Sequence, residues 1–345
     1  AAADEPCANR GMTVSTGICV TGGAGYIGSH ACYALGTEGR APLVVDNLTT
    51  GHQGAVRWGP LAHIDLRDTP QLTQALCQHN IRTVLHFAAS AYVGASMQDP
   101  ISYYDNNVYG MISLLQACLA AGVRRFILSS SCATYGIPQT VPIAETTPQH
   151  PISPYGQSKL ICETMLRDVA GQAGMDFAIL RYFNAAGADP SGALCEEHSP
   201  ETHLIPLALA ATLPQGDALA LFGTDYDTAD GTCVRAYIHV SDLVRGHLMA
   251  LAHLEKFGGS LVLNLGSGSG VSNMQVIQVV EEVTGAKVKL RKAPRRQGDP
   301  PKLIADIDQA REVIGFDPSH SDIHTIVTDA ARSFGLLKVQ NAKSA

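Results

Sequence analysis

The chain has 345 residues, enough for one large domain or two moderate ones, each with its own core. Its net charge is −7 and only 16% of its residues are charged, so the sequence does not indicate a basic face that would bind nucleic acid. No apolar run reaches the ~18 residues that a membrane helix needs. We therefore expect neither a nucleic-acid nor a membrane partner. Residues 1–16 read as a disordered tail, and residues 1–11 do not read as a secretion signal. The nine widely spread cysteines form no C-x-x-C pair and indicate free thiols in a reducing compartment, so we expect a cytoplasmic protein.

A glycine-rich turn follows the first predicted strand. Residues 18–20 are apolar, and 21–28 read TGGAGYIG. Glycines spaced in this way permit a tight turn, a close approach of backbone to a pyrophosphate, and close packing of the next helix on the strand. The predicted strand 43–46 then ends in Asp46. A carboxylate there bonds both ribose hydroxyls and repels a 2′-phosphate, so the combination predicts NAD rather than NADP, whereas a lone glycine pattern often marks a mere loop.

Strands and helices then alternate. We expect strands at 83–87, 125–130 and 177–181, and helices at 70–79, 102–121 and 154–173. This order predicts an α/β fold with a Rossmann-type, doubly wound parallel sheet covered by helices on both faces. Ligands of such sheets lie beyond the carboxyl ends of the strands, where small residues follow one strand and a run of serines ending at Ser131 follows the next.

The helix expected at 154–173 carries the clearest sign of chemistry. Tyr155 and Lys159 are four residues apart and so share one helix face. A tyrosine with a pKa near 10 is a weak base at neutral pH, but a nearby ammonium group favours the phenolate. The same spacing is common on solvated helices, so the prediction depends on the rest of the chain.

Beyond residue 184 the alternation breaks. Residues 187–200 read as a long loop, 234–240 as a strand, 241–254 as a helix and 261–265 as a further strand of the sheet. We therefore predict an NAD-binding domain of residues 17–184 plus 239–267. A smaller, interleaved α/β domain of residues 185–238 plus 268–345 would bind the substrate.

A cluster of arginines lies in the second predicted domain. Arg291, Arg295 and Arg296 come shortly before Asp299 in a chain of net negative charge. Such a cluster is a candidate site for an anion such as a diphosphate. A solvated basic loop explains the composition equally well.

Several motifs together resemble the extended short-chain dehydrogenase/reductase family. They are residues 21–30 (TGGAGYIGSH), 129–136 (SSSCATYG), 153–159 (SPYGQSK) and 181–188 (RYFNAAGA). More narrowly, four further stretches resemble the branch that epimerises C4 of UDP-hexoses: 103–108 (YYDNNV), 202–206 (THLIP), 230–235 (DGTCVR) and 295–300 (RRQGDP). The resemblance runs from about residue 17 to 335.

The resemblance implies three groups of site residues. The catalytic residues would be Ser131, Tyr155 and Lys159. NAD would contact Gly22, Gly25, Tyr26, Ile27, Gly28, Asp46, Asn47, Asp65, Leu66, Phe87, Ala88, Asn106, Tyr155, Lys159 and Tyr182. The UDP-hexose would contact Ser131, Tyr155, Asn184, Leu204, Phe222, Arg235, Arg296, Asp299 and Leu303.

The resemblance also implies an activity, the interconversion of UDP-galactose and UDP-glucose. Transient oxidation at C4 would give a 4-keto sugar that turns over before it is reduced on its other face. Two alternatives stay open: an epimerase for another UDP-sugar, UDP-xylose or UDP-glucuronate, and a low-activity NAD-binding regulatory protein. A dehydratase is disfavoured because Cys132 and Ala133, rather than an acidic pair, follow Ser131.

Three positions depart from the pattern that the resemblance implies. Ala95 and Ala236 stand where relatives carry acids, and Leu303 stands where some relatives have a tyrosine that closes the sugar pocket. The acid missing at position 236 would remove a charge beside Arg235. The smaller pocket residue at 303 predicts tolerance of the N-acetyl group of UDP-N-acetylhexosamines.

Two further expectations concern metal and assembly. The thirteen histidines show no H-E-x-x-H spacing and the cysteines form no C-x-x-C pair, so no metal site is expected. Helices 102–121 and 154–173 pair with copies of themselves in relatives, which implies a homodimer.

Overall fold

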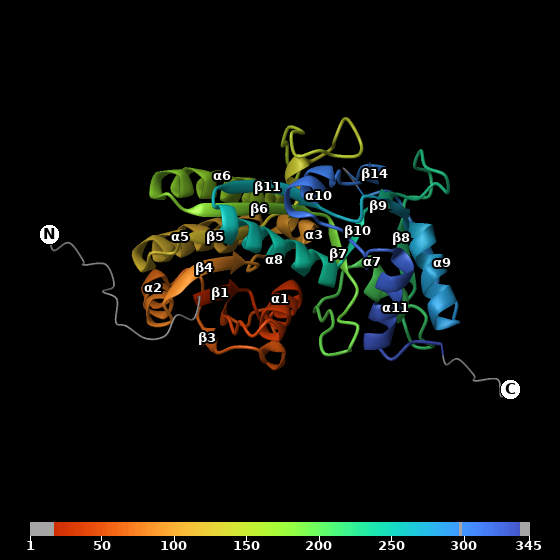
Figure 1. The fold of residues 1–345 in the computed structure, drawn as a ribbon. Coiled ribbons are helices and arrows are strands. Elements are labelled where there is room, and N and C mark those ends of the chain that lie inside the picture. Colours follow the sequence, from red (N-terminus) through yellow and green to blue (C-terminus); the bar gives the residue numbers. More distant parts are fainter. Residues whose placement is uncertain (1–16, 297–298, 339–345) are drawn as a thin grey trace.

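The computed structural model describes residues 17–296 and 299–338, which form two packed parts (Figure 1). The tail expected at 1–16 lies outside the described residues. Within the described part of the chain, none of the helices is long and apolar enough to cross a bilayer.

A seven-stranded sheet forms the larger part, and every neighbouring pair of its strands is parallel. The expected parallel sheet is thus confirmed. The order across it is β11, β6, β5, β4, β1, β2 and β3. The strands are β1 (Gly17–Thr21), β2 (Leu43–Asp46), β3 (Leu61–His63), β4 (Ile81–His86), β5 (Arg125–Ser129), β6 (Asp176–Tyr182) and β11 (Ser260–Leu265).

Helices cover both faces of this sheet (Figure 1). α2 (Thr69–Gln78), α5 (Gly110–Ala121) and α6 (Pro154–Ala173) pack on one face, and α1 (Tyr26–Thr37), α8 (Val240–Phe257) and α10 (Asp308–Ile314) on the other. Because side chains alternate along a strand, Phe126 of β5 points to the first helix layer and its neighbour Ile127 to the second. Both layers exclude water from the strands, as continuous apolar runs require.

The helix α6 begins and ends where the sequence predicts. Ser153 caps its first turn by accepting a hydrogen bond from the amide of Gly156 at 3.2 Å, and Pro154 occupies the first helical position. Gly174 ends it in the left-handed conformation, with φ of 66°. These end signals fix where α6 begins and ends, and so they fix where Tyr155 and Lys159 lie along the helix.

The helix expected at 102–121 is interrupted. The chain forms α3 (Val93–Gln98) and α4 (Pro100–Tyr103), then a π-helical turn (Tyr104–Tyr109), and only then α5. π-turns are rare and often mark functional sites. This one carries Asn106 and Asn107.

The smaller part has its own core, built mainly from α7 (Leu204–Ala210), α9 (Asn273–Thr284) and α11 (Ile323–Ser333). Short strands complete it: β7 (Asn184–Ala186), β8 (Leu219–Phe222), β9 (Val234–Arg235), β10 (Tyr237–His239), β12 (Val271–Ser272), β13 (Leu290–Ala293) and β14 (Lys302–Leu303). The prediction of one strand at 234–240 is wrong, because the chain switches partners at Ala236. β9 pairs with β12 and β14, whereas β10 pairs with β7.

One stretch differs from the expected division into domains. Ala305, Ile307, Ala310 and Phe316 fall in the range assigned to the substrate domain, yet they pack with α8 and the large sheet. The rest of that division remains a prediction.

Candidate active site

The glycine turn between β1 and α1 fits a pyrophosphate. A Cβ on Gly28 would lie 2.1 Å from the carbonyl oxygen of Gly22, and one on Gly22 would lie 2.6 Å from the amide nitrogen of Ala88. Only glycine therefore allows this turn to close. α1 begins after Gly25 without a side-chain cap and without an acid in its first turn. Its first amides thus remain available to an anion, as the NAD prediction requires.

Asp46 lies at the end of β2 beside this turn. Its two carboxylate oxygens accept hydrogen bonds from the amides of Ala24, at 3.0 Å, and Leu48, at 2.8 Å. Both bonds fix the orientation of the carboxylate, which is 9% exposed. A carboxylate oxygen accepts more than one hydrogen bond, so the geometry fits the ribose hydroxyls expected there.

Asp65 has partners that the sequence did not indicate. Arg67 donates to both of its oxygens, at 2.8 and 2.9 Å, and Asn47 donates to one at 2.9 Å. The hydrogen bonds from Arg67 hold the pKa of Asp65 well below its ordinary value. The expected contact with adenine remains a prediction, with Leu66 beside it partly buried in the core.

The segment after β4 lies against the glycine turn. The amides of Phe87 and Ala88 donate to the carbonyl of Thr21 at 3.0 and 3.1 Å. The segment that begins with Phe87 therefore lies directly against the end of β1.

Asn107 is a structural residue that the sequence reasoning missed. Its amide group bonds both the amide and the carbonyl of Ser90, at 2.8 and 3.0 Å, and also the hydroxyl of Ser158 at 3.0 Å. The π-turn places this side chain, which is 3% exposed, between α6 and the segment after β4. Asn106, the residue expected to contact NAD, donates to Asn107 at 3.0 Å.

The structure brings the three predicted catalytic residues together at the carboxyl end of β5. Ser131 caps the short helix Cys132–Tyr135, and its hydroxyl lies near enough to the phenol of Tyr155 to lower the pKa of that phenol. Lys159, one turn further along α6, donates to the carbonyl of Ser129 at 2.9 Å. Tyr182, on the neighbouring β6, hydrogen-bonds the hydroxyl of Ser129 at 2.6 Å.

The surroundings of Tyr155 in the protein oppose ionisation of its phenol. Burial raises the pKa of Tyr155 to about 12, and the hydrogen bond from Ser131 offsets only part of this rise. Burial also lowers the pKa of Lys159, whose ammonium group points at the carbonyl of Ser129. Desolvation therefore acts against the charged form of both groups.

A buried ion pair supports α6 one turn beyond Lys159. Glu163 is fully buried and accepts hydrogen bonds from Arg181 of β6 at 2.6 and 2.9 Å and from Ser130 at 2.6 Å. Burial alone would raise the pKa of Glu163, but the bonds from Arg181 hold it below its ordinary value. This contact joins α6, β6 and the serine run, and no pattern in the sequence indicated it.

The residues expected to bind the nucleotide diphosphate occupy the smaller part. Arg235, 9% exposed, forms an ion pair with Asp299, and the guanidinium of Arg296 lies over the ring of Phe222 at 4.2 Å. Ala236 is buried. Arg235 therefore has a carboxylate partner in Asp299, although position 236 is an alanine.

Two further predicted substrate residues lie at the junction of the parts. Asn184 donates to the carbonyl of Ala236 at 2.8 Å. Leu303 pairs in register with Arg235 and packs against Cys132 and Tyr135, beside the turn that carries Ser131. Leu204 begins α7.

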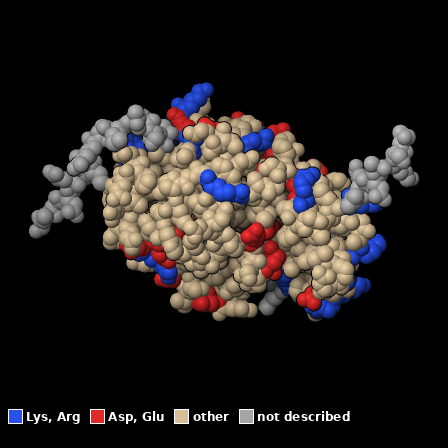
Figure 2. Space-filling view, turned by 90° about the horizontal axis from the view of Figure 1, so that it is seen from below, with Lys and Arg blue, Asp and Glu red and all other residues tan. Residues whose placement is uncertain are grey.

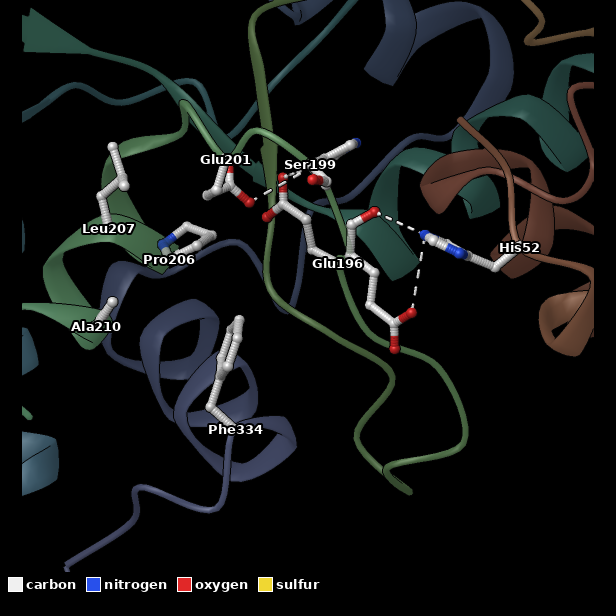
Figure 3. Close-up of a pocket in the computed structure, with 10 residues that line it drawn as sticks. His52, Glu196, Ser199, Glu201, Pro206, Leu207, Ala210 and Phe334 are labelled. Atoms are coloured by element: carbon white, nitrogen blue, oxygen red, sulfur yellow. Dashed lines mark hydrogen bonds and ion pairs between the residues drawn. The ribbon is translucent and has the colours of Figure 1, made fainter. Parts of the chain in front are cut away.

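A cavity of about 400 Å³ opens beside the loop that precedes α7 (Figure 3). Its wall includes Glu196, His198, Glu201, Leu207 and Phe334, and none of the predicted catalytic residues. On the face drawn in Figure 2, charged side chains of both signs are scattered among uncharged ones, without a broad basic field.

Comparisons with known proteins agree with this arrangement. The NAD dependent epimerase/dehydratase family matches residues 18–266. A UDP-glucose 4-epimerase of Rhizobium meliloti (strain 1021) is 49% identical over 313 residues, 91% of this chain and 95% of the relative.

Solved structures are similarly close to this fold. The UDP-glucose 4-epimerase from Brucella ovis in complex with NAD superposes with a TM-score of 0.91 at 50% identity, covering 93% of this chain and 99% of the other. The enzyme from Bifidobacterium longum in complex with NAD+ and UDP gives a TM-score of 0.88 at 35% identity, covering 93% and 98%. The chain therefore belongs to the NAD-dependent epimerase/dehydratase family, in which these relatives are UDP-glucose 4-epimerases.

Proposed function

We propose that this protein interconverts UDP-galactose and UDP-glucose through transient oxidation at C4 of the hexose. The observation that carries the proposal is the cluster of Ser131, Tyr155 and Lys159 at the carboxyl end of β5, in a sheet whose first turn fits a pyrophosphate. Relatives that match over more than nine-tenths of both chains carry this activity in their names.

The cofactor would lie along the carboxyl ends of the strands. The amides at the start of α1 would hold the pyrophosphate, Asp46 the ribose, and Phe87 and Ala88 the wall beside them. When bound, NAD would accept a hydride from C4 and return it to the opposite face of the sugar.

Tyr155 would take the proton of the sugar O4 and later give it back. Since burial raises the pKa of its phenol, it needs positive charge nearby, which the ammonium of Lys159 and the oxidised nicotinamide would supply together. Ser131, whose hydroxyl lies close to that phenol, would hold the same oxygen of the sugar in line.

The smaller part would grip UDP and leave the hexose free to turn over. Arg235 and Arg296 would face the diphosphate, with Asp299 orienting Arg235 and Phe222 beside the uracil. Asn184 and Leu204 would line the path between the two ends of the substrate. Loose contacts to the sugar are required because the 4-keto intermediate must present both faces.

We further infer that UDP-N-acetylhexosamines are substrates. The observation that favours this is Leu303, which packs beside the turn of Ser131 and has no polar group that could close the sugar pocket. If UDP-galactose is converted but UDP-N-acetylglucosamine is not, this part of the proposal fails.

The same proposal includes a homodimer formed by α5 and α6. Tyr109, Ile112 and Leu119 lie along the α5 side and are 48%, 38% and 44% exposed, which is unusual for a surface that meets only water. Light scattering of the purified protein should give the mass of two chains.

The decisive assay omits added cofactor. Purified protein incubated with UDP-galactose alone should form UDP-glucose, and denaturation should release NAD in a near-stoichiometric amount. Release of NAD without conversion of any UDP-sugar would support a regulatory NAD-binding protein instead. Conversion of UDP-xylose or UDP-glucuronate without conversion of UDP-galactose would support an epimerase for that other UDP-sugar.

A further inference from the structure

The loop before α7 brings together two carboxylates and two imidazoles. Glu196, His198, Glu201 and His203 each offer one ligand atom, and these atoms all lie within 4.8 Å of one another. The sequence shows a signal in retrospect, because Glu-x-His occurs twice with a spacing of five residues. It differs from the spacing of helical zinc motifs, and we therefore expected no metal.

The distances between these atoms resemble the edges of a coordination tetrahedron. The Nδ1 atom of His198 lies 3.1 Å from a Glu196 oxygen and 3.7 Å from a Glu201 oxygen, and the Nδ1 atom of His203 lies 2.9 and 2.8 Å from the same two carboxylates. Zinc holds nitrogen and oxygen ligands at about 2.0–2.2 Å, which places tetrahedral ligands about 3.3–3.6 Å apart. The cluster needs only small adjustments to reach that geometry.

A second observation is independent of these distances. Glu196 is 6% exposed, and its inward oxygen, like Nδ1 of His198, is buried without a hydrogen-bond partner among the described residues. The two atoms are close together, yet their angles do not make a hydrogen bond. Leaving a buried carboxylate oxygen and a buried imidazole nitrogen unpaired at this distance is costly, and a cation bound between them would satisfy both.

Glu201 is fixed by the backbone. Its Oε1 atom accepts hydrogen bonds from the amides of Thr202, at 2.6 Å, and His203, at 2.7 Å. Second contacts of this kind orient metal ligands.

We propose that Glu196, His198, Glu201 and His203 bind one Zn²⁺ ion. Imidazole nitrogen and carboxylate oxygen are both ligands that zinc accepts, and four protein ligands leave no position for water or substrate. The site is therefore structural rather than catalytic. The cavity beside Glu196, His198 and Glu201 gives the ion a path in from solvent (Figure 3).

The ion would fasten the loop to both parts of the molecule. His203 directly precedes Leu204, the first residue of α7, so an ion bound to His203 would fix the position of a predicted substrate residue. The ring of His198 lies 6.1 Å from that of Tyr26, at the glycine turn, and 5.9 Å from that of Tyr92, after β4. Zinc would thus seat the loop against the cofactor side.

The competing explanation is two imidazolium–carboxylate ion pairs with no ion. Four side chains of balanced charge can pair in this way, and the contact between Glu201 and His203 has hydrogen-bond geometry. The experiment must therefore count bound metal.

The test uses the full chain, expressed without a polyhistidine tag, stripped with a chelator and dialysed against Zn²⁺. Elemental analysis should find about one Zn²⁺ per chain, and calorimetric titration should show one tight site. Glu196→Gln and His203→Gln should each weaken zinc binding at least tenfold. The matched control His52→Gln alters a histidine of the same cavity wall outside the cluster and should bind as the unmodified chain does.

The absorption spectrum of bound Co²⁺ distinguishes metal bound at this cluster from metal bound by cysteine thiolates. Co²⁺ bound here should give the visible absorption of a tetrahedral ion without a thiolate charge-transfer band. Circular dichroism verifies that each variant is folded, and only the unmodified chain and His52→Gln should gain in Tm on adding Zn²⁺. Equal zinc binding by the unmodified chain and folded Glu196→Gln, or a thiolate band, would overturn the proposal. Because the readouts are metal content and spectra, the result is independent of epimerase activity.

Discussion

The part that would bind the cofactor and the part that would bind the nucleotide are shaped by different kinds of contact. On the cofactor side, backbone geometry and buried hydrogen bonds shape the site: Gly22 and Gly28 have no room for a Cβ, and Asn107 bonds three groups around it. On the nucleotide side, the shape comes from side-chain pairs such as Arg235 with Asp299, carried on strands of two or three residues. The first side tolerates few changes, whereas the second can alter its specificity one side chain at a time. Four substitutions test that contrast.

The largest effect is expected at Tyr155. Tyr155→Phe removes the only proposed proton acceptor and should reduce kcat by about 10³-fold or more, with little change in Tm. Coupled spectrophotometric assay of UDP-glucose formation measures this. Tyr33→Phe, which alters a tyrosine that packs on Trp58 outside the proposed site, should behave as the unmodified chain does. A kcat within a few-fold of normal for Tyr155→Phe would remove the basis of the proposed function.

The second-largest effect is expected when the buried ion pair between Glu163 of α6 and Arg181 is broken. Glu163→Gln leaves Arg181 charged and unpaired in the core, which should cost about 3–5 kcal/mol of unfolding free energy in urea titration. As a control, Glu255→Gln breaks a more exposed pair with Arg40 and should change stability by less than about 1 kcal/mol.

The same pair predicts how stability depends on pH. The folded-state pKa of Glu163 lies below its ordinary value of 4.5, so its contribution is complete above that pH and is lost as the pH falls through the folded-state pKa. The Tm of the unmodified chain should therefore fall more steeply below about pH 4.5 than that of Glu163→Gln. Parallel curves would show that the pair contributes nothing to acid sensitivity.

A methyl group in the glycine turn should have a smaller effect on stability but a specific one on cofactor. Gly28→Ala places a Cβ against the carbonyl of Gly22 and should cost about 1–3 kcal/mol while abolishing copurification of NAD. Gly171→Ala, in α6 with open space around it, should stabilise the protein by about 0.5–1 kcal/mol. Normal NAD content in Gly28→Ala would contradict the backbone argument.

The smallest effect should come from the nucleotide side. Arg235→Gln removes one charge-assisted contact and should raise KM for UDP-galactose about 10- to 100-fold, with kcat changed far less. Arg311→Gln, an exposed arginine paired with Asp308, should leave KM unchanged. A fall in kcat equal to the rise in KM would show that Arg235 acts on the reacting carbon as well.

The sequence by itself determined the order and type of the elements in the large sheet, the glycine turn, and the shared face of Tyr155 and Lys159. These depend on local rules: the period of a helix, the end signals of α6, and the alternation of strands and helices. Its interpretation of one strand at 234–240 was wrong, because the change of partner at Ala236 depends on β7, β12 and β14.

Only the tertiary structure decided the features made by distant residues. Asp299 pairs with Arg235, although 64 positions separate them in the sequence. The π-turn aims Asn107 at Ser90 and Ser158, and burial sets the pKa of Tyr155 above that of a free phenol despite Lys159. Desolvation and long-range contacts depend on what the folded chain places around a group, which no local pattern encodes.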